Sequence, residues 1–347
     1  MKQILLLLLI FSMGCLKQSE PVLSEKMIYI YPTLDFVYDL ELQADTLYVA
    51  NGELGIKAFK IKNDEKMVLD SIYEGRVFSE EENIIDLELS EVSGILFALD
   101  KFHYTTARYT QSFFDDAFSG MVIQSTCYNY QSKSTVFVDE VSSQILTLNR
   151  KIDQFDESNR STSIGKTIVL NEIYYLDKDC SQEVINDLNY GLTDLDFDND
   201  KLYISNANKD VPSIQVYNIN EGDFSLVVED TLSVLPITIR AYGNAYVVGL
   251  DNKGGCYIAL LDADGNIGSS DSKFNIAKGF TIRKIHYSNN LLVLSAGYGG
   301  VLVYNWDGES IPTPRAMIST GYAYSALVYD NNKIIVGTKN GIQIYEI

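Results

Sequence analysis

Histidine, cysteine, proline and tryptophan are scarce in this chain. Its 347 residues include two histidines, four cysteines, six prolines and one tryptophan. The two histidines, His103 and His286, have no carboxylate or cysteine at metal-ligand spacing. This argues against a histidine-based metal site or catalytic triad, so each is interpreted as a surface or strand residue. The sequence also lacks a G-x-S-x-G motif, a P-loop and a G-x-G-x-x-G motif before a helix.

The cysteines that follow the N-terminal segment are few and widely spaced. Cys127, Cys180 and Cys256 are odd in number and include no C-x-x-C pair. This excludes a zinc ribbon and a small domain held together by disulfides. Two interpretations remain open: buried free thiols, or a bridge between Cys127 and Cys180 in an oxidising compartment.

Basic residues are outnumbered by acidic ones. The chain has 27 Lys and Arg against 47 Asp and Glu, which gives a formal net charge of −20. Phosphate backbones are repelled by such a charge, so nucleic acid is not an expected partner. The acidic surface either serves solubility alone or includes a face that attracts cations or basic groups.

Long apolar runs are absent apart from one near the N-terminus. Lys2 precedes the run 4–11, which is too short to span a bilayer and suits the h-region of a secretory signal. Gly14 before Cys15 resembles a bacterial lipoprotein signal, in which the cysteine is lipidated after cleavage. Ser12 departs from that pattern, which has Leu at this position. The alternative is a plain cleaved signal peptide.

These features predict a signal peptide in 1–14, a lipidated Cys15 with a polar tether in 15–25, and a folded part in 26–347. The acyl chains would attach the protein to a membrane without a spanning helix. Leu16, in place of an acidic residue after the cysteine, favours sorting to the outer membrane of a Gram-negative bacterium, by likeness to other lipoproteins.

Aromatic residues are abundant, with 24 Tyr and 15 Phe, and they favour strands. The segment Asp39–Ile61 reads as three short strands separated by turns rich in Asp, Asn and Gly. Period-2 alternation bounded by such turns is typical of antiparallel hairpins. Degenerate copies recur along the chain, and their second strands are centred on Tyr48, Phe97, Phe137, Tyr203, Tyr246, Val293 and Ile334.

A repeat of about 40–50 residues with four strands predicts an all-β fold, a single seven-bladed β-propeller of four-stranded antiparallel blades. The seventh unit has three strands, and the spare strand Met27–Tyr31 would complete it and close the ring. Six or eight blades are the alternatives, because the region 102–187 repeats poorly. There the third unit is assigned to Val122–Tyr130, Thr135–Val138, Gln144–Leu148 and Thr167–Tyr175.

Two segments resemble the LVIVD-type repeat: Leu47–Gly52 with Gly55-Ile56, and Leu292–Gly297 with Gly300–Val303. That family has a Tyr-Val-Ala-like strand, an Asp/Asn-Gly turn and a strand that begins with Gly. The likeness covers about half of the chain. It implies a β-propeller on secreted or surface lipoproteins of bacteria, without a general catalytic role, and it supplies no binding residues.

Acidic turns raise the question of calcium. Asp194, Asp196, Asp198 and Asp200 alternate, and Asp262–Asn266 resembles the start of a calcium loop. The EF-hand match fails, because its sixth position is not Gly and its twelfth is not Glu. Turn and strand roles are therefore the main interpretation, no cofactor is predicted, and calcium remains the alternative.

Propellers usually bind at one end of the central channel, where loops enter the innermost strands and join second to third strands. The residues expected on this candidate binding face are Asn51, Glu53, Asp100, Asp139, Glu140, Asn206, Asn208, Asp251, Asn252, Tyr298, Lys339 and Asn340. His103, Glu80, Glu81, Glu82, Tyr190 and Tyr322 lie in the same kinds of loop. Tyr and Asn suit contact with protein or glycan, and the alternative is that these residues only complete turns.

Two functions from different classes follow. The first is a monomeric, membrane-anchored, non-enzymatic binding module that presents its loop-rich face to a protein or glycan partner. The second is a propeller lactonase or hydrolase that uses carboxylates and a divalent metal at the channel mouth. The lack of catalytic spacing favours the first hypothesis.

Overall fold

The computed structural model is an all-β structure made of four-stranded antiparallel sheets, as expected from the sequence. It describes residues 26–33, 35–62, 66–73, 83–89, 95–101, 109–115, 122–130, 132–139, 144–152, 169–176, 182–188, 191–220, 223–262, 267 and 272–347. For the strands between residues 100 and 188 it describes the backbone alone. Cys15, the predicted signal peptide and most of the predicted tether lie outside these residues.

The described strands form seven such sheets, and six of them follow the chain order from the innermost strand outwards. The first contains β2 (Asp39–Gln43), β3 (Thr46–Ala50), β4 (Ile56–Ile61) and β5 (Met67–Tyr73). The second contains β6 (Ile84–Leu89), β7 (Leu96–Lys101), β8 (Tyr109–Asp115) and β9 (Val122–Tyr130). The third contains β10 (Ser132–Asp139), β11 (Gln144–Ile152), β12 (Val169–Leu176) and β13 (Gln182–Leu188).

The remaining sheets come from the second half of the chain. The fourth contains β14 (Leu192–Asp198), β15 (Lys201–Asn206), β16 (Ser213–Asn220) and β17 (Asp223–Thr231). The fifth contains β18 (Pro236–Tyr242), β19 (Ala245–Leu250), β20 (Gly255–Leu260) and β21 (Lys273–Ile276). The sixth contains β22 (Lys284–Ser288), β23 (Leu291–Ser295), β24 (Val301–Asn305) and β25 (Thr313–Ile318).

The last sheet combines both ends of the folded part. It contains β26 (Ala323–Asp330), β27 (Lys333–Thr338), β28 (Gly341–Glu346) and, outermost, β1 (Lys26–Tyr31). Strand β1 is antiparallel to β28, with Lys26 opposite Glu346 and Tyr31 opposite Ile342. The N-terminal strand therefore has the partner that was expected for it.

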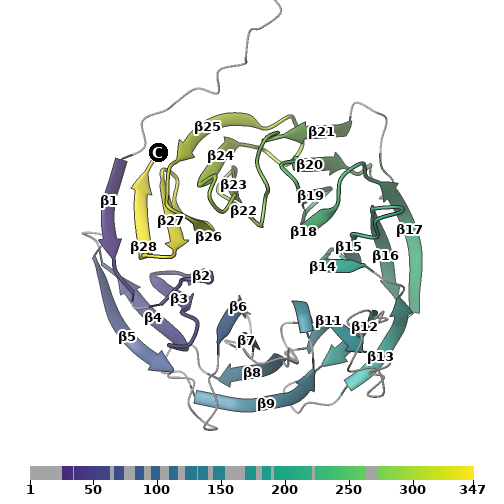
Figure 1. Cartoon of the computed structure of the whole chain (residues 1–347), viewed down its shortest axis with the longest axis horizontal. Helices are drawn as coiled ribbons and strands as arrows, with labels where there is room; N and C mark the ends of the chain where they lie inside the picture. Colours follow the sequence, from purple (N-terminus) through teal and green to yellow (C-terminus); the bar gives the residue numbers. More distant parts are fainter. Residues whose placement is uncertain are drawn as a thin grey trace, which may run out of the picture.

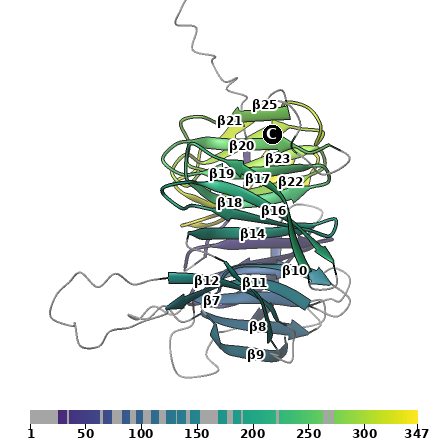
Figure 2. The same cartoon turned by 90° about the vertical axis from the view of Figure 1, so that its right-hand side faces the viewer.

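Figure 1 shows the sheets side by side around a centre, with β2, β6, β14, β18, β22 and β26 nearest to it. In the edge-on view of Figure 2, the strands run from one side of the molecule to the other, so the loops gather on two opposite faces. We call the face that carries residues 35–38, 51–55, 296–300, 321–322 and 339–340 the entry face, because the innermost strands begin there. We call the face that carries residues 44–45, 199–200, 243–244, 289–290 and 306–310 the exit face.

The second strand of a sheet is buried along its whole length in β3, β19 and β23. These strands read as continuous apolar runs because both of their surfaces pack against neighbouring sheets. One cluster joins Leu47 and Phe59 of the first sheet to Ile335 and Ile342 of the last. The hydrophobic core thus lies between adjacent sheets, and each sheet depends on its neighbours for burial.

The strand assignment between residues 122 and 175 is wrong in the sequence-based prediction. The segments predicted as the second, third and fourth strands of the third unit are its first, second and third strands, β10, β11 and β12. Strand β9 is the outer strand of the second sheet, where Tyr130 lies opposite Tyr109 and Val122 opposite Asp115. The third sheet begins only at β10, so Phe137 lies on an innermost strand and not on a second strand. Alternation has the same period in inner and outer strands, so only the pairing decides where a sheet begins.

The hairpin turns of the exit face explain the Asn- and Asp-rich sequences between first and second strands. Asn199 and Asp200 have φ values of 51° and 58°, and Asn289 and Asn290 have 52° and 57°. Two successive residues with positive φ are what a type I′ hairpin turn requires, and Asn and Asp tolerate this conformation. Within the described residues, no helix is long and apolar enough to serve as a membrane span.

Candidate functional site

Two turns that join a second to a third strand, residues 51–55 and 296–300, share one geometry on the entry face. The Asn51 amide donates to the Gly55 carbonyl at 2.9 Å, and the Ala296 amide donates to the Gly300 carbonyl at 2.8 Å. Gly52 and Gly297 both have a φ of 56°, and each forms a bridge to the first residue of the next sheet's innermost strand, Ile84 or Ala323. The repeated sequence pattern therefore encodes a turn that also connects neighbouring sheets.

The third position of this turn projects its side chain outwards. It is occupied by Glu53, which is exposed, and by Tyr298, whose exposed fraction is 86%. Two exposed side chains of the predicted binding face thus occupy equivalent positions in different sheets.

Five aromatic side chains form a continuous group on the entry face, which we call the aromatic patch: Phe36, Tyr38, Tyr298, Tyr322 and Tyr324. Ring centroids are 4.8 Å apart for Tyr298 and Tyr322, and 4.4 Å apart for Tyr322 and Tyr324. Tyr324 then contacts Tyr38 at 5.2 Å and Phe36 at 5.7 Å. The patch crosses from the sixth sheet over the last to the first.

Asp35 holds one end of the patch in place. Its carboxylate accepts hydrogen bonds from the amides of Phe36 at 2.7 Å and Glu53 at 2.8 Å. A Cβ added to Gly52 would lie 2.2 Å from the Asp35 carboxylate, so only glycine allows this approach. The Asn51 side chain donates to the carbonyls of Asp35 and Phe36 at 3.0 and 3.1 Å. These contacts fix the segment that presents Phe36.

Charged groups border the patch. Lys339 Nζ lies 5.5 Å from the centroid of the Phe36 ring, within the range of a cation–π contact. Burial raises the pKa of Tyr38, and the negative charge of Asp35 raises it further. The patch therefore offers ring faces, phenol hydroxyls and charges of both signs to a ligand.

The structure brings some of the predicted binding residues together at the patch. Glu53, Tyr298, Tyr322 and Lys339 border or form it, and Asn340 is exposed beside Lys339. Asn51 is fully buried, so it shapes the loop and is not available for direct contact. The aromatic pairs Phe36/Tyr38 and Tyr322/Tyr324, which lead into innermost strands, were the signal that could have identified the rest of the patch.

The other predicted residues lie elsewhere. Asn206, Asn208, Asp251 and Asn252 belong to turns of the fourth and fifth sheets, where the Asn206 side chain accepts from the Asn208 amide at 2.9 Å. Asp100 is the second-last residue of the second strand β7. Asp139 ends the innermost strand β10, so it lies at the exit face and not on the predicted face; only the backbone is described for both residues. Among the residues singled out in the sequence analysis, the following lie outside the described part: Glu140, His103, Glu80, Glu81, Glu82, Tyr190 and Cys180. Cys256 is a buried free thiol.

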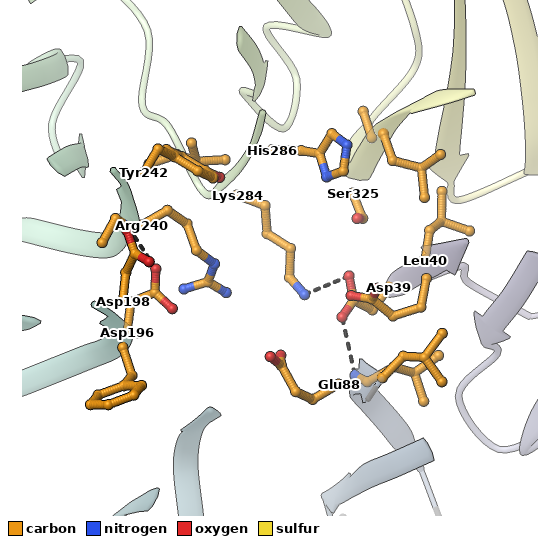
Figure 3. Close-up of a pocket in the computed structure, with 18 residues that line it drawn as sticks. Asp39, Leu40, Glu88, Asp196, Asp198, Arg240, Tyr242, Lys284, His286 and Ser325 are labelled. Atoms are coloured by element: carbon orange, nitrogen blue, oxygen red, sulfur yellow. Dashed lines mark hydrogen bonds and ion pairs between the residues drawn. The ribbon is translucent and has the colours of Figure 1, made fainter. Parts of the chain in front are cut away.

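The innermost strands enclose a central cavity of about 320 Å³ (Figure 3), which the sequence-based prediction did not identify. Its charged lining includes Asp39, Glu41, Glu88, Arg240 and Lys284. Lys284 Nζ is 2.6 Å from Asp39 Oδ1 and 2.7 Å from Asp86 Oδ1. Carboxylates outnumber cations among the described residues of this cavity, and Lys284 bridges the first and second sheets from the sixth.

Carboxylates on the innermost strands also connect neighbouring sheets. Asp194, Asp196 and Asp198 alternate along β14 and accept hydrogen bonds from three backbone amides of the β18 hairpin. The donors are the amides of Ile239 at 3.0 Å, Ala241 at 2.6 Å and Gly243 at 2.7 Å. Asp39 accepts from the Leu87 amide at 3.1 Å in the same way. The alternating aspartates therefore bind sheet to sheet.

Burial has the largest effect on the pKa values of the acidic side chains in the cavity. It raises the pKa of Glu41 to about 8 and that of Asp196 to about 6. Burial also raises the pKa of Glu88, and the neighbouring Glu41 contributes. For Asp39, burial acts to raise the pKa, but the Lys284 ammonium together with hydrogen bonds from Lys284, Asp86 and the Leu87 amide outweighs it and holds the pKa below its usual value. Glu41 is thus protonated at neutral pH, which reduces the negative charge of the cavity.

His286 faces the same cavity and is neutral there. Burial lowers its pKa to about 4, and its Nε2 has no hydrogen-bond partner among the described residues. Those residues also contain no group of three His, Cys, Asp or Glu side chains that could hold a metal ion. The cavity chemistry in the described part is that of buried ion pairs and protonated acids.

Comparison with known proteins identifies the fold type but no family. No family model and no curated protein sequence matches the chain. Among solved structures, the crystal structure of the computationally designed Ika8 protein matches with a TM-score of 0.61 and 12% sequence identity. The match covers 93% of this chain and 100% of that chain. Because the identity is so low, the likeness shows only that the chain shares an all-β fold with that protein.

Proposed function

We propose that this chain is a membrane-anchored, non-enzymatic β-propeller that binds a partner protein through its entry face. The aromatic patch is the observation that carries this proposal. Tyrosine is enriched where proteins bind other proteins, because it offers a large ring and a polar hydroxyl at low entropic cost. The 86% exposed fraction of Tyr298 leaves that side chain open to a partner.

The geometry of the patch favours a protein over a glycan. The rings of Tyr298 and Tyr322 are inclined by 86°, and those of Tyr322 and Tyr324 by 44°. Only Phe36 and Tyr324, at 21°, come close to a flat platform. An extended sugar chain stacks best on rings that share a plane, whereas a protein surface can contact edges and faces in several orientations.

We further propose that the sheets are the blades of a seven-bladed β-propeller, closed by β1 beside β28. The sheet order β1-β28-β27-β26 and the six sheets of consecutive strands support this arrangement. In a ring closed in this way every sheet has a neighbour on each side, and the last sheet has its outer strand, so no sheet lacks a partner. The repeated entry-face turn supports the relationship to LVIVD-type repeats.

The anchor and the location remain proposals from the sequence. The apolar run before Gly14 and Cys15 supports export and lipidation, and Leu16 supports the outer membrane. In the folded part, β1 begins at Lys26, so 15–25 would connect the lipid to the outermost strand of the last sheet.

Site-specific photo-cross-linking in the cells that make the protein tests this proposal. A photo-reactive phenylalanine derivative replaces Tyr298 on the entry face, and the matched control carries it in place of Asp200 on the exit face. We expect a defined protein adduct from position 298 that is absent from position 200. Equal adducts from both positions, or glycan and no protein captured at position 298, would reject a protein-binding entry face.

A further inference from the structure

A second pocket lies on the exit face, at the opposite end of the innermost strands from the aromatic patch. It has a volume of about 490 Å³, within the usual range of small-molecule sites. Its functional lining is Asp198, Tyr242, Tyr287, Asp307 and Glu309. Asp198 and Tyr242 also line the central cavity, so the two spaces adjoin.

Aromatic rings form one side of this exit-face pocket. The centroids of Tyr242 and Tyr287 are 5.1 Å apart, with their planes inclined by 57°. Trp306 packs behind both rings, with its centroid 5.1 Å from Tyr287 and 6.4 Å from Tyr242. Trp306 is only 2% exposed, and its indole donates to the Ser310 carbonyl at 2.9 Å. These contacts fix the position of Trp306, which in turn limits the movement of the two tyrosine rings.

The charges around the pocket have one sign. Asp198, Asp307 and Glu309 line it, and none of its described lining residues is Lys, Arg or His. The Asp307 carboxylate accepts from the amides of Glu309 and Ser310 at 2.9 and 2.8 Å, and these hydrogen bonds lower its pKa. Asp307 is therefore ionised at neutral pH. Its hydrogen bonds to Glu309 and Ser310 also fix the conformation of the loop 307–310.

We propose that the exit-face pocket binds a small organic ammonium ion. Ring faces attract cations through their quadrupole, and carboxylates add direct attraction. A bare metal ion fits less well, because the described residues offer no group of three ligands and the tyrosine rings would remain unused. This inference is independent of the partner proposed for the entry face.

Trp306 is the only tryptophan of the chain and packs against Tyr242 and Tyr287, so tryptophan fluorescence reports on the rings that line this pocket. The probe is choline, and its neutral counterpart is 3,3-dimethylbutan-1-ol, in which carbon replaces the charged nitrogen. We expect a saturable change in Trp306 fluorescence with choline, and binding of the neutral alcohol at least about 10-fold weaker. Sodium chloride at equal ionic strength controls for screening.

Three variants locate the binding. Tyr287→Ala removes a ring and should weaken choline binding about 10-fold, whereas Tyr287→Phe keeps the ring and should stay within about 2-fold. Glu309→Gln should weaken binding about 3-fold, and Glu229→Gln, the same charge change at an exposed residue of the outer strand β17, should leave it unchanged. Thermal melts verify that each variant is folded.

The proposal is overturned if choline and the neutral alcohol bind equally. It is also overturned if Glu309→Gln and Glu229→Gln have the same effect, or if neither fluorescence nor titration calorimetry detects choline at tens of millimolar.

Discussion

Asp194 on β14 and Arg240 on β18 form an ion pair between two neighbouring sheets, with 3.1 Å between Oδ2 and Nη1. The same carboxylate oxygen accepts from the Thr238 hydroxyl at 2.7 Å and from the Ile239 amide at 3.0 Å. One buried oxygen thus has three donors, all from the neighbouring sheet. Removing it would leave a partly buried guanidinium, a buried hydroxyl and a buried amide without this acceptor.

Asp194→Ala should therefore destabilise the protein strongly. We expect a loss of about 3 kcal/mol in the free energy of unfolding, because the buried Thr238 hydroxyl and Ile239 amide lose their acceptor and Arg240 loses one of its carboxylate partners. Urea denaturation followed by circular dichroism measures it. Asp210→Ala, at an exposed aspartate of the same sheet, should stay within about 0.5 kcal/mol. Equal effects of the two substitutions would contradict the role assigned to Asp194.

Stability should fall as the pH rises from about 6.5 to about 8. Glu41 has its pKa raised to about 8, so the folded state holds a proton that the unfolded state has already lost. The contribution is complete below the ordinary pKa of a glutamate and disappears as the pH passes about 8. His286, with its pKa lowered to about 4, acts in the opposite direction only below about pH 6.5.

Urea midpoints at several pH values between 6.5 and 8 check this prediction. We expect a slope that approaches about 1 kcal/mol per pH unit in the wild type and is clearly smaller in Glu41→Gln. The control is Glu309→Gln, which changes an exposed carboxyl group and should keep the wild-type slope. A wild-type slope retained by Glu41→Gln would show that another group is responsible.

Gly52 and Gly243 offer a matched pair for the entry-face turn. Their φ values are 56° and 60°, so an alanine at either position would have a similar backbone strain. They differ in space: a Cβ at residue 52 would lie 2.2 Å from the Asp35 carboxylate, and one at residue 243 meets nothing within 4 Å.

Gly243→Ala should therefore lower the free energy of unfolding by about 1 kcal/mol, and Gly52→Ala by about 3 kcal/mol. Near-ultraviolet circular dichroism should also change in Gly52→Ala, because displacement of Asp35 disturbs the aromatic patch. Equal losses of stability would mean that Asp35 moves without cost.

Strand β1 should contribute to the stability of the whole fold. A chain that starts after β1, at residue 33, leaves the edge of β28 without its partner. We expect a thermal midpoint lower by several degrees and a tendency to associate, because an unpaired strand edge attracts other edges. A chain that starts at residue 26 is the control. Identical midpoints would argue against closure by β1.

The local sequence determined the strands and turns of this protein. Alternation in Asp39–Ile61, continuous apolar runs such as Leu291–Ser295 and the Asn- and Asp-rich hairpins each follow from burial and backbone conformation within a few residues. The spare strand and its partner were predictable for the same reason, since the last unit lacked an outer strand.

Tertiary structure alone decided which side chains meet. Lys284 lies 198 residues from Asp86, and period-2 alternation on an innermost strand resembles that on any other strand. Only the arrangement of the sheets around a centre brings Asp86 and Asp39 to the same Lys284 ammonium and joins Tyr38 to Tyr324 in the aromatic patch. The physical reason is that these contacts depend on sheet-to-sheet packing, which no segment of the sequence encodes by itself.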